Sequence, residues 1–208
     1  MNMIEEPFND YGIIKEEDGL ALKVEDYPWR GIDIELQELH YLHGARFVNQ
    51  LKLITYYGDF HPVEGETDIF STGGAQGEDY INLLNAARKA VEHGYQVFIL
   101  PNPKGFRTAD FIFVRKGVYK MFDLKTVSGK NSVDNRLSES IGQTNRVLLH
   151  MLVDYNPSAL ARSIKRYFVS NPNAKEVLVF KGKKLLSVTR KTLDDNQFFQ
   201  TFIRRYIK

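Results

Sequence analysis

The chain has 208 residues, of which 43% are apolar and 12% aromatic, so we expect a folded globular protein and exclude a disordered chain. It contains no cysteine, which excludes disulfides and thiolate metal sites. No apolar run approaches the roughly 18 residues of a membrane-spanning helix, and residues 1–10 have no secretion-signal pattern. These features predict a cytoplasmic protein with no membrane partner.

Charge is distributed unevenly along the chain, although its net value is only +2. Residues 1–103 contain 7 Lys and Arg against 18 Asp and Glu, whereas residues 104–208 contain 21 against 8, a balance of +13. A strongly basic half indicates a polyanionic partner, of which nucleic acid is the simplest. The alternative is that the acidic half folds onto the basic half and neutralises it.

We interpret residues 1–75 as an acidic N-terminal region with mixed α/β structure. Residues 31–42 alternate in polarity at first and then follow a helical spacing, whereas residues 49–57 are predicted to form a strand. The segment Ser71-Thr-Gly-Gly-Ala-Gln-Gly77 is small and rich in glycine, which is typical of a boundary. We therefore predict a second domain over residues 76–208.

From Glu78 onward the pattern predicts helices that alternate with strands and hairpins. The expected order is a helix to His93, a strand over 95–100, a hairpin over 109–126, a helix over 133–143, a strand over 146–153, a helix opened by Asn156-Pro157, a hairpin over 176–190 and a C-terminal helix. This order predicts an α/β fold in which helices flank a mixed central sheet.

The first of these hairpins carries the candidate catalytic residues. Asp110 opens its first strand, a turn over residues 115–117 follows, and Asp123 and Lys125 lie near the end of its second strand. Residues two apart on a strand point to the same face, so Asp123 and Lys125 should share a face. If the strands pair around the turn, Asp110 falls beside both of them. Two carboxylates and an amine that converge suit a site that binds a divalent metal and activates water.

The spacing of Asp110, Asp123 and Lys125 resembles the PD-(D/E)xK nuclease pattern over about residues 76–150. Thr-Ala precedes Asp110 in place of the Pro of the pattern, and Asp123 stands where Glu is commoner. The resemblance implies a restriction-endonuclease-like fold, with Mg²⁺ or Mn²⁺ held by Asp110, Asp123 and Glu78 beside the catalytic Lys125. Glu78 is equally well explained as an acid that stabilises the start of its helix.

Further residues are candidates for contacts with substrate. Gln143 resembles the glutamine of a fourth motif found in some of these nucleases, and Arg146 follows it closely. Thr126 and Ser128 could bond phosphate from the end of the strand, although an ordinary turn explains them better. The five histidines do not form a repeated metal-binding pattern, and the glycines near residue 74 do not match a phosphate-binding loop.

A second resemblance, to bacterial toxin nuclease domains, is carried by residues 86–101, 108–110, 122–126 and 140–149. Similar domains end contact-dependent growth-inhibition proteins and some phage head-morphogenesis proteins. The resemblance implies cleavage of tRNA or DNA, and an inhibitor or immunity protein as a further partner. Some relatives are metal-independent ribonucleases, and in that alternative Lys125, Thr126 and Arg190 act without a metal while Asp110 is structural.

The predicted function is therefore hydrolysis of phosphodiester bonds in RNA or DNA by a toxin-like or mobile-element-associated nuclease. The basic C-terminal half would track the nucleic-acid backbone. The alternative outside enzymes is a non-catalytic module of phage or mobile-element origin that binds nucleic acid or protein. The sequence leaves the oligomeric state open.

Overall fold

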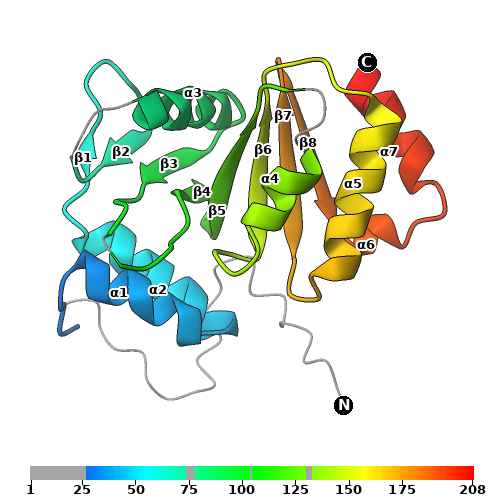
Figure 1. Ribbon diagram of the computed structural model, residues 1–208. Coiled ribbons are helices and arrows are strands. Elements are labelled where there is room, and N and C mark those ends of the chain that lie inside the picture. Colours follow the sequence, from blue (N-terminus) through cyan, green and yellow to red (C-terminus); the bar gives the residue numbers. More distant parts are fainter. Residues whose placement is uncertain (1–26, 74–77, 104, 130–132) are drawn as a thin grey trace, which may run out of the picture.

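The computed structural model describes residues 27–73, 78–103, 105–129 and 133–208. These parts of the chain form an eight-stranded mixed sheet with helices on both faces (Figure 1). The predicted α/β class with a mixed central sheet is thus confirmed. Among the described helices, none is long and apolar enough to cross a membrane.

The strands follow one another across the sheet in chain order. The pairs β2–β3, β5–β6 and β6–β7 are parallel, and the remaining pairs are antiparallel. The strands are β1 (His61–Pro62), β2 (Ile69–Ser71), β3 (Gln96–Ile99), β4 (Phe111–Arg115), β5 (Val118–Val127), β6 (Arg146–Met151), β7 (Glu176–Lys181) and β8 (Lys184–Thr189).

Each parallel pair of strands is joined through a helix, as the long crossover of parallel pairing requires. These crossover helices are α3, α4 and α5 in turn. Asn156 caps α5 by accepting a hydrogen bond from the amide of Ala159 at 2.9 Å, and Pro157 occupies its first turn. The helices are α1 (Ile32–Glu38), the short 3₁₀ helix η4 (Leu39–Tyr41), α2 (Gly44–Tyr57), α3 (Glu78–Glu92), α4 (Val133–Glu139), α5 (Pro157–Ser170), α6 (Arg190–Leu193) and α7 (Phe198–Ile207).

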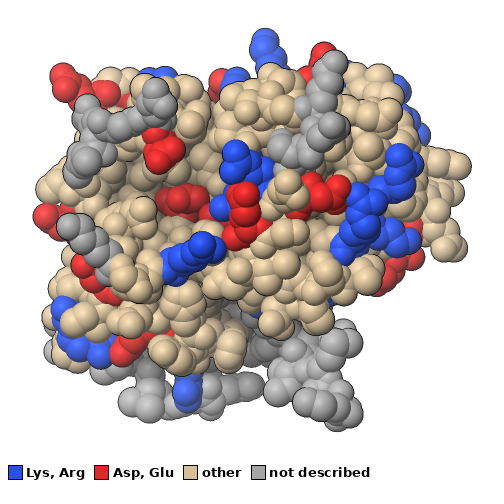
Figure 2. Space-filling model, in the orientation of Figure 1, with Lys and Arg blue, Asp and Glu red and all other residues tan. Residues whose placement is uncertain are grey.

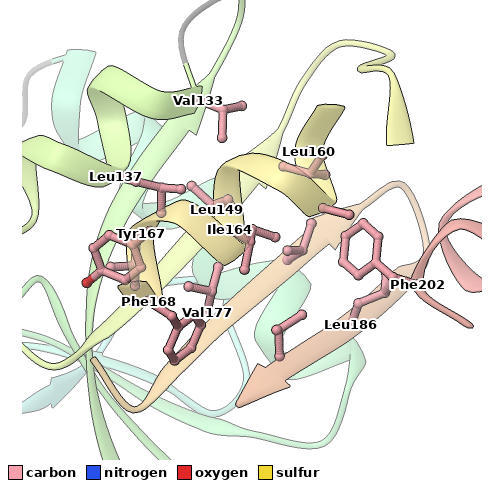
Figure 3. Close-up of a cluster of buried hydrophobic side chains, with 14 of the residues drawn as sticks. Val133, Leu137, Leu149, Leu160, Ile164, Tyr167, Phe168, Val177, Leu186 and Phe202 are labelled. Carbon is pink, nitrogen blue, oxygen red and sulfur yellow. The ribbon is translucent and has the colours of Figure 1, made fainter. Parts of the chain in front are cut away.

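Alternating side chains of the strands build separate cores on the two faces of the sheet. One face is covered by α3, whose Ala87 and Ala90 pack with strand residues such as Phe113. The other face carries two apolar layers. In the first layer α1 and α2 pack on β3, β4 and β5, with Leu51 buried among them. In the second layer α4, α5 and α7 pack on β5 to β8, with Ile164 near the centre (Figure 3). This face is therefore divided along β5.

Two sequence-based expectations are corrected by the structure. The strand predicted over residues 49–57 is wrong, because these residues belong to α2, where Leu51 and Ile54 are buried. With Phe47 they follow the helical repeat, and this amphipathic pattern overrides the aromatic and β-branched composition. The helix predicted over residues 133–143 ends at Glu139, because tight turns follow in which Gly142 has a φ of 87°.

Part of the acidic N-terminal region belongs to the central sheet. β1 and β2 form one edge of the sheet, and α1 and α2 cover part of one face. For the described residues of this region, the content is the expected mixture of helix and strand. The predicted boundary between residues 75 and 76 lies outside the described residues, so the division into two domains stays a prediction.

Candidate active site

Asp110 lies just before β4 and close to Asp123 of the neighbouring strand β5. β4 and β5 pair in antiparallel register, with Phe111 opposite Phe122 at the start of β4. The Asp110 amide donates a hydrogen bond to the Phe122 carbonyl at 3.0 Å, which holds Asp110 against β5. A two-residue turn at Lys116-Gly117, with positive φ at both residues, connects the strands and sets this register.

The structure brings Asp110, Asp123 and Lys125 together as the sequence predicts. Lys125 Nζ lies 3.1 Å from Oδ1 and 2.8 Å from Oδ2 of Asp123. Oδ2 of Asp110 accepts a hydrogen bond from the Leu124 amide at 2.6 Å, which holds this carboxylate against β5. We call Asp110, Asp123 and Lys125 the acid–lysine cluster; their catalytic roles stay a prediction.

Burial raises the pKa of both carboxyls in the cluster. Asp123 is only 1% exposed, and burial raises its pKa while the Lys125 ammonium opposes the shift. Burial, and then the negative charge of Asp123, raise the pKa of Asp110 to about 7, against the lowering effect of the Leu124 amide. A buried pair of carboxyls, in which Asp123 disfavours the ionisation of Asp110, favours a proton or a cation between them near neutral pH.

The acid–lysine cluster lies where the two apolar layers on its face of the sheet meet. On β5, Met121 packs with the α1–α2 layer and Val127 with the α4–α5–α7 layer. Asp123 and Lys125 lie between them on the same face of the strand. Acidic and basic side chains interleave in a band across the middle of this view, over and beside α4 (Figure 2). The two signs of charge therefore mix on this face, although they are segregated along the sequence.

The chemistry of the cluster fits a small divalent cation. Oδ2 of Asp123 is buried and lies 2.8 Å from the Lys125 ammonium, so a bound cation would share this carboxylate with the lysine. Mg²⁺ is commonly held by one or two carboxylates together with waters and substrate phosphates. Within the described residues, no group of three or more His, Asp or Glu side chains converges. Glu78 begins α3, but its side chain lies outside the described part of the chain, so its role as a third ligand stays a prediction.

A cavity of about 670 Å³ adjoins the acid–lysine cluster. Thr108 and Met121 line it, and each is two residues along its strand or loop from Asp110 or Asp123. The cluster itself does not line the cavity. We call it the basic cavity because its lining, drawn from the described residues, includes one acidic side chain, Glu176, and the cations Lys120, Arg146, Lys175, Arg190 and Lys191.

Three predicted substrate-contacting residues line this cavity, namely Gln143, Arg146 and Arg190. Gln143 Nε2 donates a hydrogen bond to the Glu139 carbonyl at 3.0 Å. Arg146 is buried, with Nε 3.6 Å from Oε2 of Glu176. The Arg190 guanidinium donates to main-chain carbonyls at and after the end of α5, those of Phe168, Asn171 and Pro172, at 3.2, 2.7 and 2.7 Å. Arg190 therefore holds the end of α5 in place, a role that its sequence context does not reveal.

Thr126 and Ser128 are placed away from the acid–lysine cluster. Thr126 follows Lys125 on β5 and so points to the opposite face of the sheet, and Ser128 lies exposed beyond the strand. Arg190 follows β8, three strands from β5, or roughly 14 Å at about 4.8 Å per strand. The structure therefore does not assemble Lys125, Thr126 and Arg190 into one metal-free site.

The basic cavity also contains residues that sequence reasoning missed. Lys120 donates to Glu176 at 2.9 Å, and Ser187 donates to the same carboxylate at 2.6 Å. His40 and His43, from the acidic N-terminal region, also line the cavity. These residues come from segments far apart in the chain, so no local pattern could have grouped them.

Comparisons with known proteins give little further information. No family model matches the chain, and no curated protein matches it in sequence. Among solved structures, the chain is similar to the CdiA-CT/CdiI toxin and immunity complex from Burkholderia pseudomallei, at 19% identity and a TM-score of 0.37. The similarity covers 56% of this chain and 92% of that chain. A likeness at this TM-score establishes neither a shared fold nor a shared activity, so function has to be inferred from the site.

Proposed function

We propose that this protein hydrolyses phosphodiester bonds of nucleic acid with Mg²⁺ or Mn²⁺ as its cofactor. The observation that carries the proposal is the acid–lysine cluster, in which two carboxyls lie close together and a lysine contacts one of them. A bound divalent cation would supply Lewis-acid activation of water and of the phosphate. Asp110 and Asp123 would hold it, with Glu78 proposed as a third ligand.

Lys125 is the residue that we propose acts on the reacting groups. Its amine lies 2.8 Å from Asp123 and its side chain is only 12% exposed, so it is held in one place. From there an ammonium can donate a hydrogen bond to a phosphate oxygen and offset the charge that develops in the transition state. A neutral amine in the same position could accept a proton from the attacking water.

The protonation state of Asp110 is expected to control the binding of the cation. Burial, and then the charge of Asp123, raise the pKa of Asp110 to about 7, so this carboxyl competes for protons near neutral pH. A hard cation binds carboxylate and not carboxylic acid. Cation binding should therefore strengthen as pH rises through about 7.

Nucleic acid is the proposed substrate because the cluster adjoins a cavity lined mainly by cationic and polar side chains. The choice between RNA and DNA is open in this proposal. A toxin-like or mobile-element-associated role, with tRNA as one candidate substrate and an inhibitor or immunity protein as a partner, belongs to the same proposal. That part rests on the sequence resemblance alone.

One observation favours the non-catalytic alternative. Asp123 is 1% exposed and already paired with Lys125, so the two could form a structural ion pair in a module that only binds nucleic acid or protein. The alternative predicts binding without cleavage.

The test is a cleavage assay on purified protein with tRNA, single-stranded DNA and duplex DNA. Each substrate is incubated with Mg²⁺, with Mn²⁺ and with EDTA, and Asp123→Asn protein serves as the matched inactive control. We expect cleavage by the wild type only when a metal is present. If no substrate is cleaved under any condition, the proposal of a binding module would replace the proposal of a nuclease. Cleavage in EDTA would exclude dependence on a metal.

A further inference from the structure

The basic cavity has two chemically different walls. One wall comes from the N-terminal helices η4 and α2 and the residues between them, and presents Leu39, Leu42 and Phe47 together with His40 and His43. The other wall comes from β5 and the segments around β6 to β8, and carries Lys120 and the other Lys and Arg side chains of the cavity. A ligand that fills this space should therefore have an apolar part and a negative part.

The cationic wall is built around a buried carboxylate. Glu176 is 5% exposed and is held by Lys120 Nζ at 2.9 Å and by Ser187 Oγ at 2.6 Å. Arg146 lies beside the same carboxylate, with Nε at 3.6 Å. Glu176 thus holds the Lys120 ammonium and the Arg146 guanidinium on the same wall of the cavity. Among the described residues of the lining, cationic side chains outnumber the single acid, which favours an anionic ligand.

Lys175 also lines the cavity, from the half-buried loop before β7. Burial lowers the pKa of its amine.

We infer that the basic cavity binds a nucleotide unit of the substrate, with its base and sugar against the η4–α2 wall and its phosphate toward the cationic wall. A volume of about 670 Å³ is suitable, since small-molecule pockets span roughly 300–1,000 Å³. The amides of Gln143, Asn145 and Asn173 also line the cavity, and they can hydrogen-bond base edges.

The position of the cavity makes this nucleotide a neighbour of the cleaved bond. Thr108 and Met121 line the cavity and lie two residues from Asp110 and Asp123, which is about 7 Å along a strand. Adjacent nucleotides of one strand can bridge such a distance. This part of the inference rests on the proposed nuclease function, whereas binding in the cavity does not. It also gives the N-terminal region a role, because residues 39–47 supply the apolar wall.

The experiment measures binding of adenosine and uridine 5′-monophosphate, with inorganic phosphate as a comparison, by calorimetry in EDTA so that the acid–lysine cluster holds no metal. Lys191→Glu changes the charge of the cavity lining, and Leu42→Ala removes part of its apolar wall. The matched control is Lys183→Glu, an exposed lysine in the β7–β8 turn at the other end of that hairpin. Thermal unfolding of each variant verifies that it is folded.

We expect Lys191→Glu to weaken nucleotide binding about tenfold and Lys183→Glu to leave it within about twofold. Leu42→Ala should weaken nucleotide binding but not phosphate binding. Equal loss in both lysine variants, or phosphate binding as tight as nucleotide binding, would overturn the inference.

Cleavage kinetics separate the inference from the proposed function. If both hold, Lys191→Glu raises KM for an oligonucleotide with kcat largely kept, whereas Asp123→Asn removes kcat. If the wild type binds nucleotide in this cavity but cleaves nothing with any metal, the nuclease proposal fails and the binding site stands. If the wild type cleaves but Lys191→Glu changes neither KM nor nucleotide affinity, the binding inference fails and the nuclease stands.

Discussion

Asp110 lies close to Asp123, and each of them is the chain neighbour of a residue in the last β4–β5 pair, Phe111–Phe122. The amide of Leu124, the residue after Asp123, donates to Oδ2 of Asp110 at 2.6 Å and so fixes one carboxylate beside the other. Two acids are therefore confined in a largely buried place, with Lys125 as the nearby cation. Their effects on stability, metal binding and catalysis can be measured separately.

Folding stability should depend on the protonation of Asp110. Burial, followed by the charge of Asp123, raises the pKa of Asp110 to about 7, whereas an unfolded Asp has a pKa of about 3.9. The native state therefore binds this proton more tightly, and the stabilisation is complete below about pH 4 and lost as pH rises through about 7. Its upper limit is about 4 kcal/mol, from about 1.4 kcal/mol per pKa unit. Thermal unfolding in EDTA should show a flatter pH profile for Asp110→Asn than for the wild type between these limits; parallel profiles would contradict the shift.

Asp123→Asn should abolish cleavage and weaken metal binding. A neutral amide cannot match the charge of a carboxylate at a hard cation. We expect a loss of at least about 10²-fold in kcat, the effect of removing one charged or polar group that stabilises the transition state. Calorimetric titration with Mn²⁺ tests the metal affinity. In a metal-free mechanism the variant would change stability only.

Lys125→Ala should abolish cleavage but keep metal binding or strengthen it. The substitution removes a positive charge 2.8 Å from Asp123, so a cation meets less repulsion there. Nucleic-acid binding should be nearly intact, since this is one of 21 basic residues in the C-terminal half. Lys183→Ala, at an exposed turn, is the matched control for loss of a lysine. If Lys125→Ala retained activity, a catalytic role for this residue would be excluded.

Nucleic-acid binding should weaken steeply with salt. If roughly 4–6 phosphates contact the protein, log affinity should fall against log salt concentration with a slope of about −3 to −5. Fluorescence anisotropy with a labelled oligonucleotide in EDTA provides the measurement. An affinity that is the same at low and high salt would show that the basic half is not the binding surface.

Arg190→Ala should lower stability, because the guanidinium donates to three carbonyls at and after the end of α5. Loss of these charge-assisted bonds should cost about 1 kcal/mol, since Arg190 is largely exposed. Denaturant unfolding measures the change, with Arg204→Ala, at an exposed position of α7, as control. Unchanged stability together with weaker substrate binding would restore the substrate-contacting role predicted from sequence.

Local patterns were sufficient where hydrogen bonding is local. The hairpin that carries Asp110, Asp123 and Lys125 was predictable because a two-residue turn sets the strand register and alternation sets the face of each side chain. The order of elements after Glu78 was predictable for the same reason. α2 was not predicted, because residues 49–57 have a strand-like composition that hides the helical repeat of Phe47, Leu51 and Ile54, the residues that pack on β3, β4 and β5.

The sequence by itself thus determined the elements after Glu78 and the alignment of the acid–lysine cluster within one hairpin. Only the tertiary structure decided how deeply Asp123 is buried, and hence the raised pKa of Asp110, because desolvation depends on the layers packed on either side of β5. It alone placed Arg190 against the end of α5 and closed the basic cavity with residues 39–47 from the N-terminal region. These relationships join segments far apart in the chain, and packing, which is not encoded in any local repeat, brings them together.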